Sequence, residues 1–427
     1  MLLLNKCSMW VNFFAKKLET FISLIVFTWL DLLDSFLCIV YAFLDEFFEG
    51  TSSSCYCHKT DGDDEHEGEV SETLYTRRNV FQEMGVLKLM RKMREQKEKV
   101  GEVKVNRWSD CGCEFCVCWM KTEDDVRLHV VVQEPHSSSA NIKDLEEKMI
   151  ENVLFLHGFI SSSSFWTETV FKSLSEDAQK KYRLIAVDLL GFGRSPKPRD
   201  CLYTLNNHVE MIEKSVIFSS GLSSFHLVAH SMGSIIALAL AAKHPQSVRS
   251  VTLIAPPYFP SSKDEASFMA LTKLAEKRLW PPILFGAAFM SWYEHLGRSV
   301  CFILCKYHRI WEFFLRVLTW QRNVHFLIMD ITKHTHHSAW HTMHNVICGG
   351  AKYLDGYFEI LSENRVKMTV IQGDSDQVVP LECSFNIKMK VRDADVMILP
   401  KKDHITVVIH QTRDFTQILE SIWESFK

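Results

Sequence analysis

The sequence predicts an α/β fold with a mostly parallel central sheet, helices on both faces of that sheet, and a helical lid insertion. From about Val126 onward, short apolar runs of strand length alternate with segments of helical spacing. This alternation stops after Pro257 and resumes at Val366. The intervening residues, about 258–345, are rich in Trp, Phe, His and Leu, with helical rather than strand spacing. An insertion at this point lies above the carboxyl ends of parallel strands and is expected to cover a site there.

Composition and charge divide the 427 residues into three parts. Residues 1–50 form an apolar leader, residues 51–110 a polar linker with a charged helix near Lys88–Lys99, and residues 111–427 the α/β domain with its lid. With 47% hydrophobic and 23% charged residues, the chain has enough apolar material for one large domain. The net charge of -4 provides no basic surface of the kind that binds nucleic acid, so no such partner is expected.

The apolar leader allows three interpretations. Three lysines precede Phe21–Leu30, a run with the length expected of the hydrophobic region of a secretory signal. Asp31 and Asp34 interrupt the apolar character, and each would cost roughly 2.5 to 3.5 kcal/mol near the centre of a membrane helix. Val40-Tyr41-Ala42 provides a weak cleavage site. The leader is therefore a cleaved signal, a retained membrane anchor or interfacial helix, or a helix packed on the domain.

The cysteine count is high for a cytosolic enzyme, with 13 in the chain, and it favours an oxidising compartment. Structural zinc sites usually combine two well-separated C-x2-C pairs, and the tight cluster at residues 111–118 does not have that spacing. Its alternation instead predicts a strand with both thiols of each close pair on one face. We expect disulfides or free thiols here and no metal site. The cysteines concerned are Cys111, Cys113, Cys116 and Cys118, with Cys55 and Cys57 upstream.

The predicted lid contains the densest histidine cluster of the chain. His337 and His341 are four residues apart and share a helix face, but no glutamate occupies the position that an H-E-x-x-H zinc site requires. Packing or a lid function is therefore expected rather than metal binding. The lid tryptophans either suit an apolar substrate or hold the lid together. The other histidines are His334, His336 and His344, and the tryptophans include Trp280, Trp292, Trp311, Trp320 and Trp340.

The remaining elements of the domain follow in order. Helices are expected to begin near Phe165 and Leu381 and to cover 205–215 and 235–240. Gly191 and Gly193 lack the third glycine of a dinucleotide fingerprint, and prolines follow them, so no phosphate-binding loop and no cofactor are expected. The predicted strands cover 127–132, 152–156, 182–187, 225–228, 248–254, 366–371 and 396–399.

One turn between a predicted strand and a predicted helix carries a serine, Ser231. The residues two before and two after it are Ala229 and Gly233, which are small enough for the strand and the helix to approach each other. A serine at such a sharp turn projects its hydroxyl into open space, where it can act as a nucleophile. His230, directly before Ser231, is also part of the turn. The N–H of Met232, at the start of the helix, is placed to stabilise developing negative charge.

A second turn follows the strand 152–156, with the sequence His157-Gly158-Phe159. The glycine permits a tight turn, which leaves the N–H of Phe159 free to point at a substrate oxygen. Together with the N–H of Met232, it would form an oxyanion hole. The alternative is an ordinary turn after a strand.

Two further residues complete a catalytic triad in the order Ser, Asp, His. Asp376 follows the strand 366–371 and is the expected acid, and His404 follows the next strand and is the expected base. Asp374 is the rival acid because it also lies just past the strand end. Asp403 is adjacent to the base and is expected to be solvated.

At these residues the sequence resembles the α/β-hydrolase superfamily over roughly residues 120–427, and more narrowly the plant BODYGUARD proteins. The resemblance implies a probable lysophospholipase of a plant, located outside the cell at the wall or the outer face of the membrane. It also implies a role in cuticle formation, with a lipid or cutin-like ester as substrate. The matching segments are Phe155–Ser163, Ala186–Pro198, Pro256–Pro260, Trp292–His295 and Lys402–Thr406.

The hypothesis that follows is serine acyl chemistry, with Ser231 as nucleophile, His404 as base and Asp376 as the residue that orients the base. Water or an alcohol would accept the acyl group, and the sequence does not separate hydrolysis from transfer. A serine at the turn argues against the aspartate-dependent epoxide hydrolases and dehalogenases. Two alternatives stay open, namely a ligand-sensing protein of the same fold and a structural protein without catalysis.

Overall fold

The computed structural model describes residues 2–50, 56, 70–75, 107–119, 125–136, 150–275, 291–320, 322, 324–409 and 412–425. Several features predicted from the sequence lie outside these residues. They are the charged helix near Lys88–Lys99, most of the polar linker, Cys55, Cys57 and Trp280.

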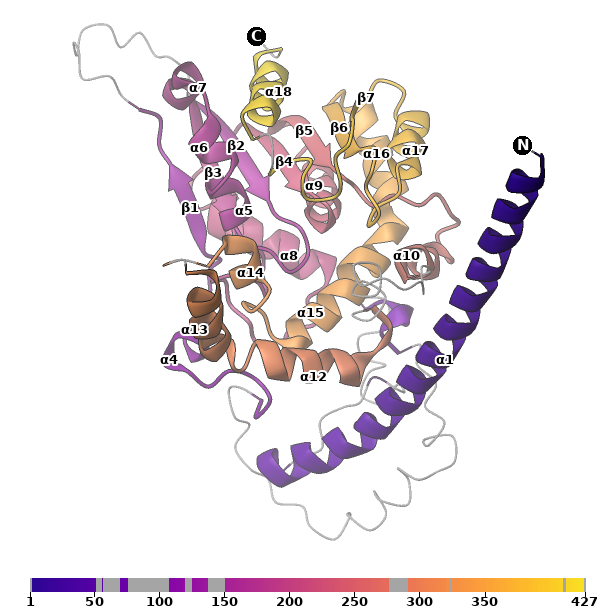
Figure 1. Cartoon of the computed structure of the whole chain (residues 1–427). Coiled ribbons are helices and arrows are strands. Elements are labelled where there is room, and N and C mark those ends of the chain that lie inside the picture. The colour runs from indigo at the N-terminus through magenta and orange to yellow at the C-terminus, as the bar shows by residue number, and fades with distance from the viewer. Residues whose placement is uncertain are drawn as a thin grey trace, which may run out of the picture.

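The described part of the domain is built on one seven-stranded sheet with the strand order β1-β3-β2-β4-β5-β6-β7 (Figure 1). Every neighbouring pair of strands is parallel except β1 and β3. The predicted α/β class with a mostly parallel sheet is therefore confirmed. The strands are β1 Val130–Gln133, β2 Glu151–Leu156, β3 Tyr182–Val187, β4 Phe225–His230, β5 Val248–Ile254, β6 Lys367–Gly373 and β7 Asp395–Leu399.

Strand β1 begins three residues later than the sequence pattern indicates. The amides of Leu128 and His129 donate to the hydroxyls of Ser215 (2.8 Å) and Ser195 (2.9 Å) instead of to a neighbouring strand. Because side chains satisfy these backbone donors, the segment is held in place without belonging to the sheet.

Helices cover both faces of the sheet. Side chains on β2 alternate, so that Leu154 and Leu156 join the apolar cluster under α8, α9 and α16, while Val153 and Phe155 join the cluster under α5, α6 and α18. This alternation is the period of two expected for a strand buried on both sides. These helices are α5 Ser164–Thr167, α6 Val170–Ser173, α8 Leu205–Ile212, α9 Met232–Lys243, α16 Leu354–Glu363 and α18 Thr412–Glu424. Two further helices flank the strands, α7 Glu176–Lys181 and α17 Glu382–Lys390.

The described part of the segment between β5 and β6 is largely helical, as its spacing predicts. Helix α15 begins at a capping box, in which Thr335 Oγ1 accepts from the Ser338 N–H and Ser338 Oγ accepts from the Thr335 N–H. Helix α16 packs on α9 and therefore belongs to the layer that covers the sheet. The lid helices are α10 Ala266–Ala275, α12 Glu294–Leu304, α13 His308–Thr319, α14 Phe326–Asp330 and α15 His336–Thr342. Short helical turns are η2 Glu72–Tyr75, η3 Glu213–Ile217, η4 Met343–Cys348 and η5 Gly349–Tyr353.

The cysteine-rich segment is not the strand that its alternation predicts. Residues Glu114–Val117 form a short helix, α4, in which the amides of Cys116 and Val117 donate to the carbonyl of Cys113. A strand would require a neighbouring strand to satisfy its backbone, whereas a single helical turn satisfies its own. Cys111, Cys113 and Cys116 form no disulfide within the described residues.

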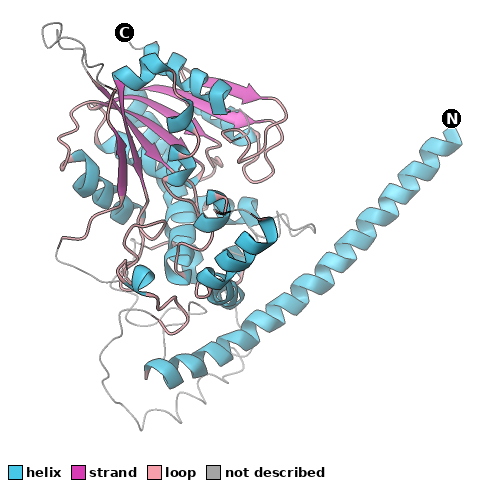
Figure 2. Cartoon of the chain, turned by 60° about the vertical axis from the view of Figure 1, so that its left-hand side comes forward, coloured by secondary structure: helices cyan, strands magenta, loops and turns pink. Residues whose placement is uncertain are grey.

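A single long helix, α1 (Leu2–Glu49), precedes the domain. Figure 2 shows that it projects away from the sheet and its helices toward the N-terminus. Its C-terminal half packs on α12, where Phe27 and Leu30 contact Tyr293 and Leu296. For residues 27–49, the helix therefore packs on the domain, the third of the three interpretations of the leader.

Two buried carboxylates of α1 are paired with the lid. Asp34 accepts from the N–H of Leu296 at 2.9 Å, and Asp45 forms a two-pronged ion pair with Arg298 at 2.8 and 2.5 Å. The side chains of Asp45 and Arg298 are almost completely buried. Asp34, which interrupts the apolar pattern in the sequence, and Asp45, which follows the apolar run, thus join α1 to α12.

We expect the substitution Asp45→Ala to lower the free energy of unfolding by about 3 kcal/mol or more, because it leaves a buried guanidinium without its carboxylate. Chemical denaturation of the full chain in detergent micelles, followed by tryptophan fluorescence, measures this loss. Asp31→Ala is the matched control, since Asp31 is exposed on the same helix. An equal loss in both variants would contradict the role assigned to the ion pair.

Candidate active site

Ser231 occupies the turn between β4 and α9 with a backbone φ of 53° and ψ of -122°. A residue with a Cβ holds such a conformation only where its surroundings enforce it. Here the N–H of Ser231 donates to the carbonyl of Ile254 at 2.8 Å. A Cβ on Gly233 would lie 2.5 Å from the carbonyl oxygen of His157, so only glycine lets the helix come this close to β2. Ala229 is completely buried at the end of β4.

Three residues predicted from the sequence meet at one edge of the sheet. Nε2 of His404 lies 3.0 Å from Oγ of Ser231, and Nδ1 of His404 lies 2.8 Å from Oδ2 of Asp376. Each residue follows a different parallel strand, namely β4, β6 or β7, and the carboxyl ends of these strands lie together. The structure thus places a hydroxyl, an imidazole and a carboxylate in one hydrogen-bonded chain.

The carboxylate of Asp376 is fully buried and held by four donors. Oδ1 accepts from the amides of Val378 (2.8 Å) and Val379 (2.9 Å). Oδ2 accepts from the side-chain amide of Gln372 at 2.8 Å in addition to His404. This arrangement satisfies a buried carboxylate and fixes the direction of the oxygen that faces the imidazole. Gln372 lies on β6 four residues before Asp376, and no motif in the sequence marks it as part of the site.

The two other aspartates near the strand ends do not contact the ring of His404 in the described structure. Asp374 is exposed and accepts from the N–H of Lys401 and the hydroxyl of Ser375. Asp403 is exposed and accepts from the amides of Ile405 and Thr406. Both carboxylates stabilise the loops that carry them.

His230, expected only as part of the turn, supports the loop of the neighbouring histidine. Its Nε2–H donates to the carbonyl oxygen of His404 at 2.8 Å, and its ring stacks on Phe165. Burial lowers the pKa of His230 to about 3, so the ring is neutral near pH 7 and its proton lies on the nitrogen that faces the carbonyl. The side chain therefore positions the backbone of His404 without adding charge to the site.

His157 and Gly158 fix the orientation of the peptide that leads to Phe159. The ring of His157 donates from Nδ1 to the carbonyl of Gly158 (2.7 Å) and accepts at Nε2 from the N–H of Leu189 (2.9 Å). Burial lowers the pKa of His157, consistent with this neutral form. Because N–H and C=O point in opposite directions in a trans peptide, the N–H of Phe159 points away from His157. In the described part of the chain, neither this N–H nor that of Met232 donates to a protein acceptor.

A cavity of about 480 Å³ opens at Ser231 and His404. This volume falls within the range of about 300–1,000 Å³ that is typical of small-molecule sites. Its wall is mostly aliphatic, and much of it comes from the lid, including Leu274, Val300 and Leu304. The described lid tryptophans are not part of this wall. Trp340 is buried in packing, while Trp320 is 94% exposed.

The described lid histidines do not form a single cluster of ligands; they contact several different partners. His337 and His341 both contact the hydroxyl of Tyr56, and their second ring nitrogens contact the carbonyls of Cys201 and Leu202. His344 contacts Thr73. These three rings join the lid to neighbouring segments. His334, in contrast, contacts the thiols of Cys301 and Cys305.

The fold and the arrangement of Ser231, His404 and Asp376 define the class of this protein as the α/β-hydrolase fold. In agreement, the family model described as "alpha/beta hydrolase fold" matches residues 151–281.

Comparison with curated proteins identifies the family within this class. "Probable lysophospholipase BODYGUARD 4" of Arabidopsis thaliana is 51% identical over 422 residues, which cover 96% of this chain and 98% of the relative. "Probable lysophospholipase BODYGUARD 5" of the same plant is 50% identical over 420 residues, 93% of each chain. "Probable lysophospholipase BODYGUARD 1" is 39% identical, with 96% and 97% of the two chains covered. The chain belongs to the BODYGUARD family.

Proposed function

We propose that this chain is a serine ester hydrolase of the lipase type. His404 takes the proton of Ser231 as the hydroxyl oxygen attacks the ester carbonyl, and Asp376 orients the imidazole and stabilises its charged form. The amides of Phe159 and Met232 hold the oxyanion. The alcohol leaves with a proton from His404, and water then releases the acid from the acyl-enzyme. The observation that carries this proposal is the 3.0 Å contact between His404 and Ser231 at an aliphatic cavity.

The substrate class proposed is a lipid or cutin-type ester. The aliphatic wall of the cavity favours an acyl chain over a polar substrate, because it offers few groups to replace lost water contacts. The names of the Arabidopsis relatives, probable lysophospholipases, support the same class. An alcohol in place of water would make the same site an acyltransferase. With the resemblance noted above, this chemistry supports a role in forming the plant cuticle.

The proposed location is the outer face of the plasma membrane or the cell wall, with α1 as the targeting or anchoring element. Leu24–Glu49 is long and apolar enough to cross a membrane. The buried contacts of Asp34 with α12 support retention of this helix in the mature protein, because cleavage after Ala42 would remove Asp34 from its partners. The apolar side chains that α1 exposes include Leu18, Phe21, Ile22, Leu24, Ile25, Trp29, Leu32 and Phe36.

A fluorophosphonate probe tests the proposed nucleophile. We expect one covalent adduct on the full chain in detergent, located by peptide mass spectrometry at Ser231. Prior incubation with a lysophospholipid or a hydroxy-fatty-acid ester is expected to slow labelling, whereas a short water-soluble ester protects less. No adduct on the folded chain, or an adduct on another serine, would contradict the proposal and favour a ligand-sensing or structural role.

A further inference from the structure

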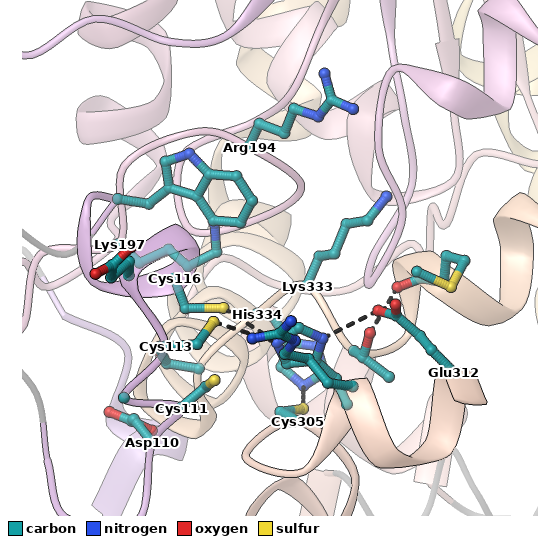
Figure 3. Close-up of a pocket in the computed structure, with 18 residues that line it drawn as sticks. Asp110, Cys111, Cys113, Cys116, Arg194, Lys197, Cys305, Glu312, Lys333 and His334 are labelled. Atoms are coloured by element: carbon teal, nitrogen blue, oxygen red, sulfur yellow. Dashed lines mark hydrogen bonds and ion pairs between the residues drawn. The ribbon is translucent and has the colours of Figure 1, made fainter. Parts of the chain in front are cut away.

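Three cysteines and one histidine converge at a second place, away from Ser231. Their ligand atoms, from Cys111, Cys113, Cys116 and His308, all lie within 4.8 Å of one another. The cysteines flank and form helix α4, and the histidine is the first residue of α13 in the lid. Figure 3 shows the three sulfur atoms together, with dashed lines from Cys113 and Cys116 to one imidazole.

The two nitrogen–sulfur distances match those of a tetrahedral centre. Nε2 of His308 lies 3.6 Å from Sγ of Cys113 and 3.5 Å from Sγ of Cys116. A tetrahedral zinc ion, with Zn–S of about 2.3 Å and Zn–N of about 2.0–2.1 Å, separates sulfur and nitrogen ligands by about 3.6 Å. The helical turn that begins at Cys113 brings the thiols of Cys113 and Cys116 to the same side. The alternation of cysteines in the sequence predicts a strand, which is wrong. The C-x-C-x2-C segment supplies three ligands, and His308 supplies the fourth.

The second nitrogen of His308 is held in the way that metal-bound histidines usually are. Nδ1 lies 3.0 Å from Oε1 of Glu312, which is four residues later on α13. A carboxylate at this nitrogen fixes the ring orientation and presents Nε2 as the ligand. The contact thus directs Nε2 toward the three thiols.

The charges around the cluster suit such a centre. A zinc ion with three thiolates and one neutral imidazole carries a net charge of about -1. Lys197 lies beside it, buried, with its ammonium donating to the carbonyls of Gly193 and Ser195 and lying over the ring of Trp119. The cavity that contains the cluster is lined by basic as well as acidic side chains, so an anionic centre has basic groups nearby. The basic side chains are Arg194, Lys197, Arg309 and Lys333, and the acidic ones are Asp110, Glu114 and Glu312.

We propose that Cys111, Cys113, Cys116 and His308 form a structural zinc site that fastens the cysteine-rich segment to lid helix α13. A disulfide would use two of the three thiols and leave the third thiol and the imidazole without a role. Thiolate and imidazole ligands select zinc over magnesium or calcium, and four protein ligands make the site closed and therefore structural. The proposal is independent of the ester chemistry at Ser231.

A neighbouring cluster provides an internal comparison. Cys301 on α12 and Cys305, which directly follows that helix, lie 3.4 and 3.8 Å from Nε2 of His334, and all three side chains are buried. This cluster supplies three ligands rather than four. Its members also border the cavity at Ser231. Substitutions in each cluster therefore identify which of the two holds a metal.

The test is the metal content of the full chain, purified in detergent with a phosphine reductant and without chelator. We expect one equivalent of zinc per chain by inductively coupled plasma mass spectrometry. Cys113→Ser and His308→Ala are expected to lose the zinc, while Cys118→Ser, an exposed cysteine of the same segment, and Cys305→Ser keep it. Hydrogen exchange should become faster in α4 and α13 when zinc is removed.

Cobalt substitution of the unmodified chain covers the case in which a variant does not fold. Tetrahedral Co²⁺ with three thiolates is expected to show intense sulfur-to-cobalt charge-transfer absorption, which zinc abolishes. Three results would overturn the proposal: a folded chain without zinc or cobalt binding, a disulfide among Cys111, Cys113 and Cys116 in the chain isolated without reductant, or zinc that is lost in Cys305→Ser but kept in Cys113→Ser.

Discussion

The substitution Ser231→Ala is expected to lower kcat for ester hydrolysis on the order of 10⁶-fold, leaving only a residual acceleration on the order of 10³- to 10⁴-fold over the reaction in water. The reason is that the alanine has no oxygen to form the acyl-enzyme, while the oxyanion amides and the cavity remain. Hydrolysis of a p-nitrophenyl ester of a medium-chain acid by the full chain in detergent measures the effect.

Ser262→Ala is the matched control for this measurement. Ser262 is an exposed serine whose hydroxyl contacts Glu265, far from the turn that carries Ser231. We expect wild-type turnover from it. If Ser231→Ala keeps a substantial fraction of the wild-type kcat while binding and folding are intact, Ser231 is not the nucleophile.

The second large effect is expected from Asp376→Asn, with a loss in kcat on the order of 10⁴-fold. The asparagine can still accept from the amides of Val378 and Val379, so the loop keeps its shape. Its NH₂ group, however, takes the place of Oδ2, so it loses the hydrogen bond from Gln372 and presents a donor to Nδ1 of His404. The ring responds by placing its proton on Nε2. That nitrogen then cannot accept the proton of Ser231.

Asp374→Asn separates the two candidate acids. Its side chain is exposed and its contacts are with Lys401 and Ser375, which an amide oxygen can replace. Turnover close to wild type is expected, together with a normal pH profile. A larger loss for Asp374→Asn than for Asp376→Asn would exchange the roles of the two residues.

The parts of the site that the sequence predicts are those encoded by local spacing. The turn that carries Ser231 requires small residues two positions before and two positions after the serine. The acid and the base each follow a strand, and the alternation of strands and helices sets the order of these strands. The same logic places the amides of Phe159 and Met232. Each of these residues is recognised by its position next to one strand or one turn, so the linear sequence is enough to predict it.

The parts that the sequence did not reveal depend on partners far apart in the chain. His308 completes the cluster of Cys111, Cys113 and Cys116 from almost two hundred residues away, and no spacing rule connects them. Asp34 is interpreted from the sequence as a break in an apolar run because its partner lies on α12, and no spacing rule connects Asp45 to Arg298. Gln372 and His230 act through single hydrogen bonds whose geometry only the folded chain defines.

The contact between α1 and α12 couples the N-terminal helix to the wall of the cavity. Helix α12 forms part of this wall through Val300 and Leu304, and Arg298 of the same helix forms a buried ion pair with Asp45 of α1. Because this ion pair is buried, α12 cannot move away from the cavity without either carrying α1 with it or leaving two buried charges unpaired. Any contact that restrains α1 therefore also restrains this wall of the cavity.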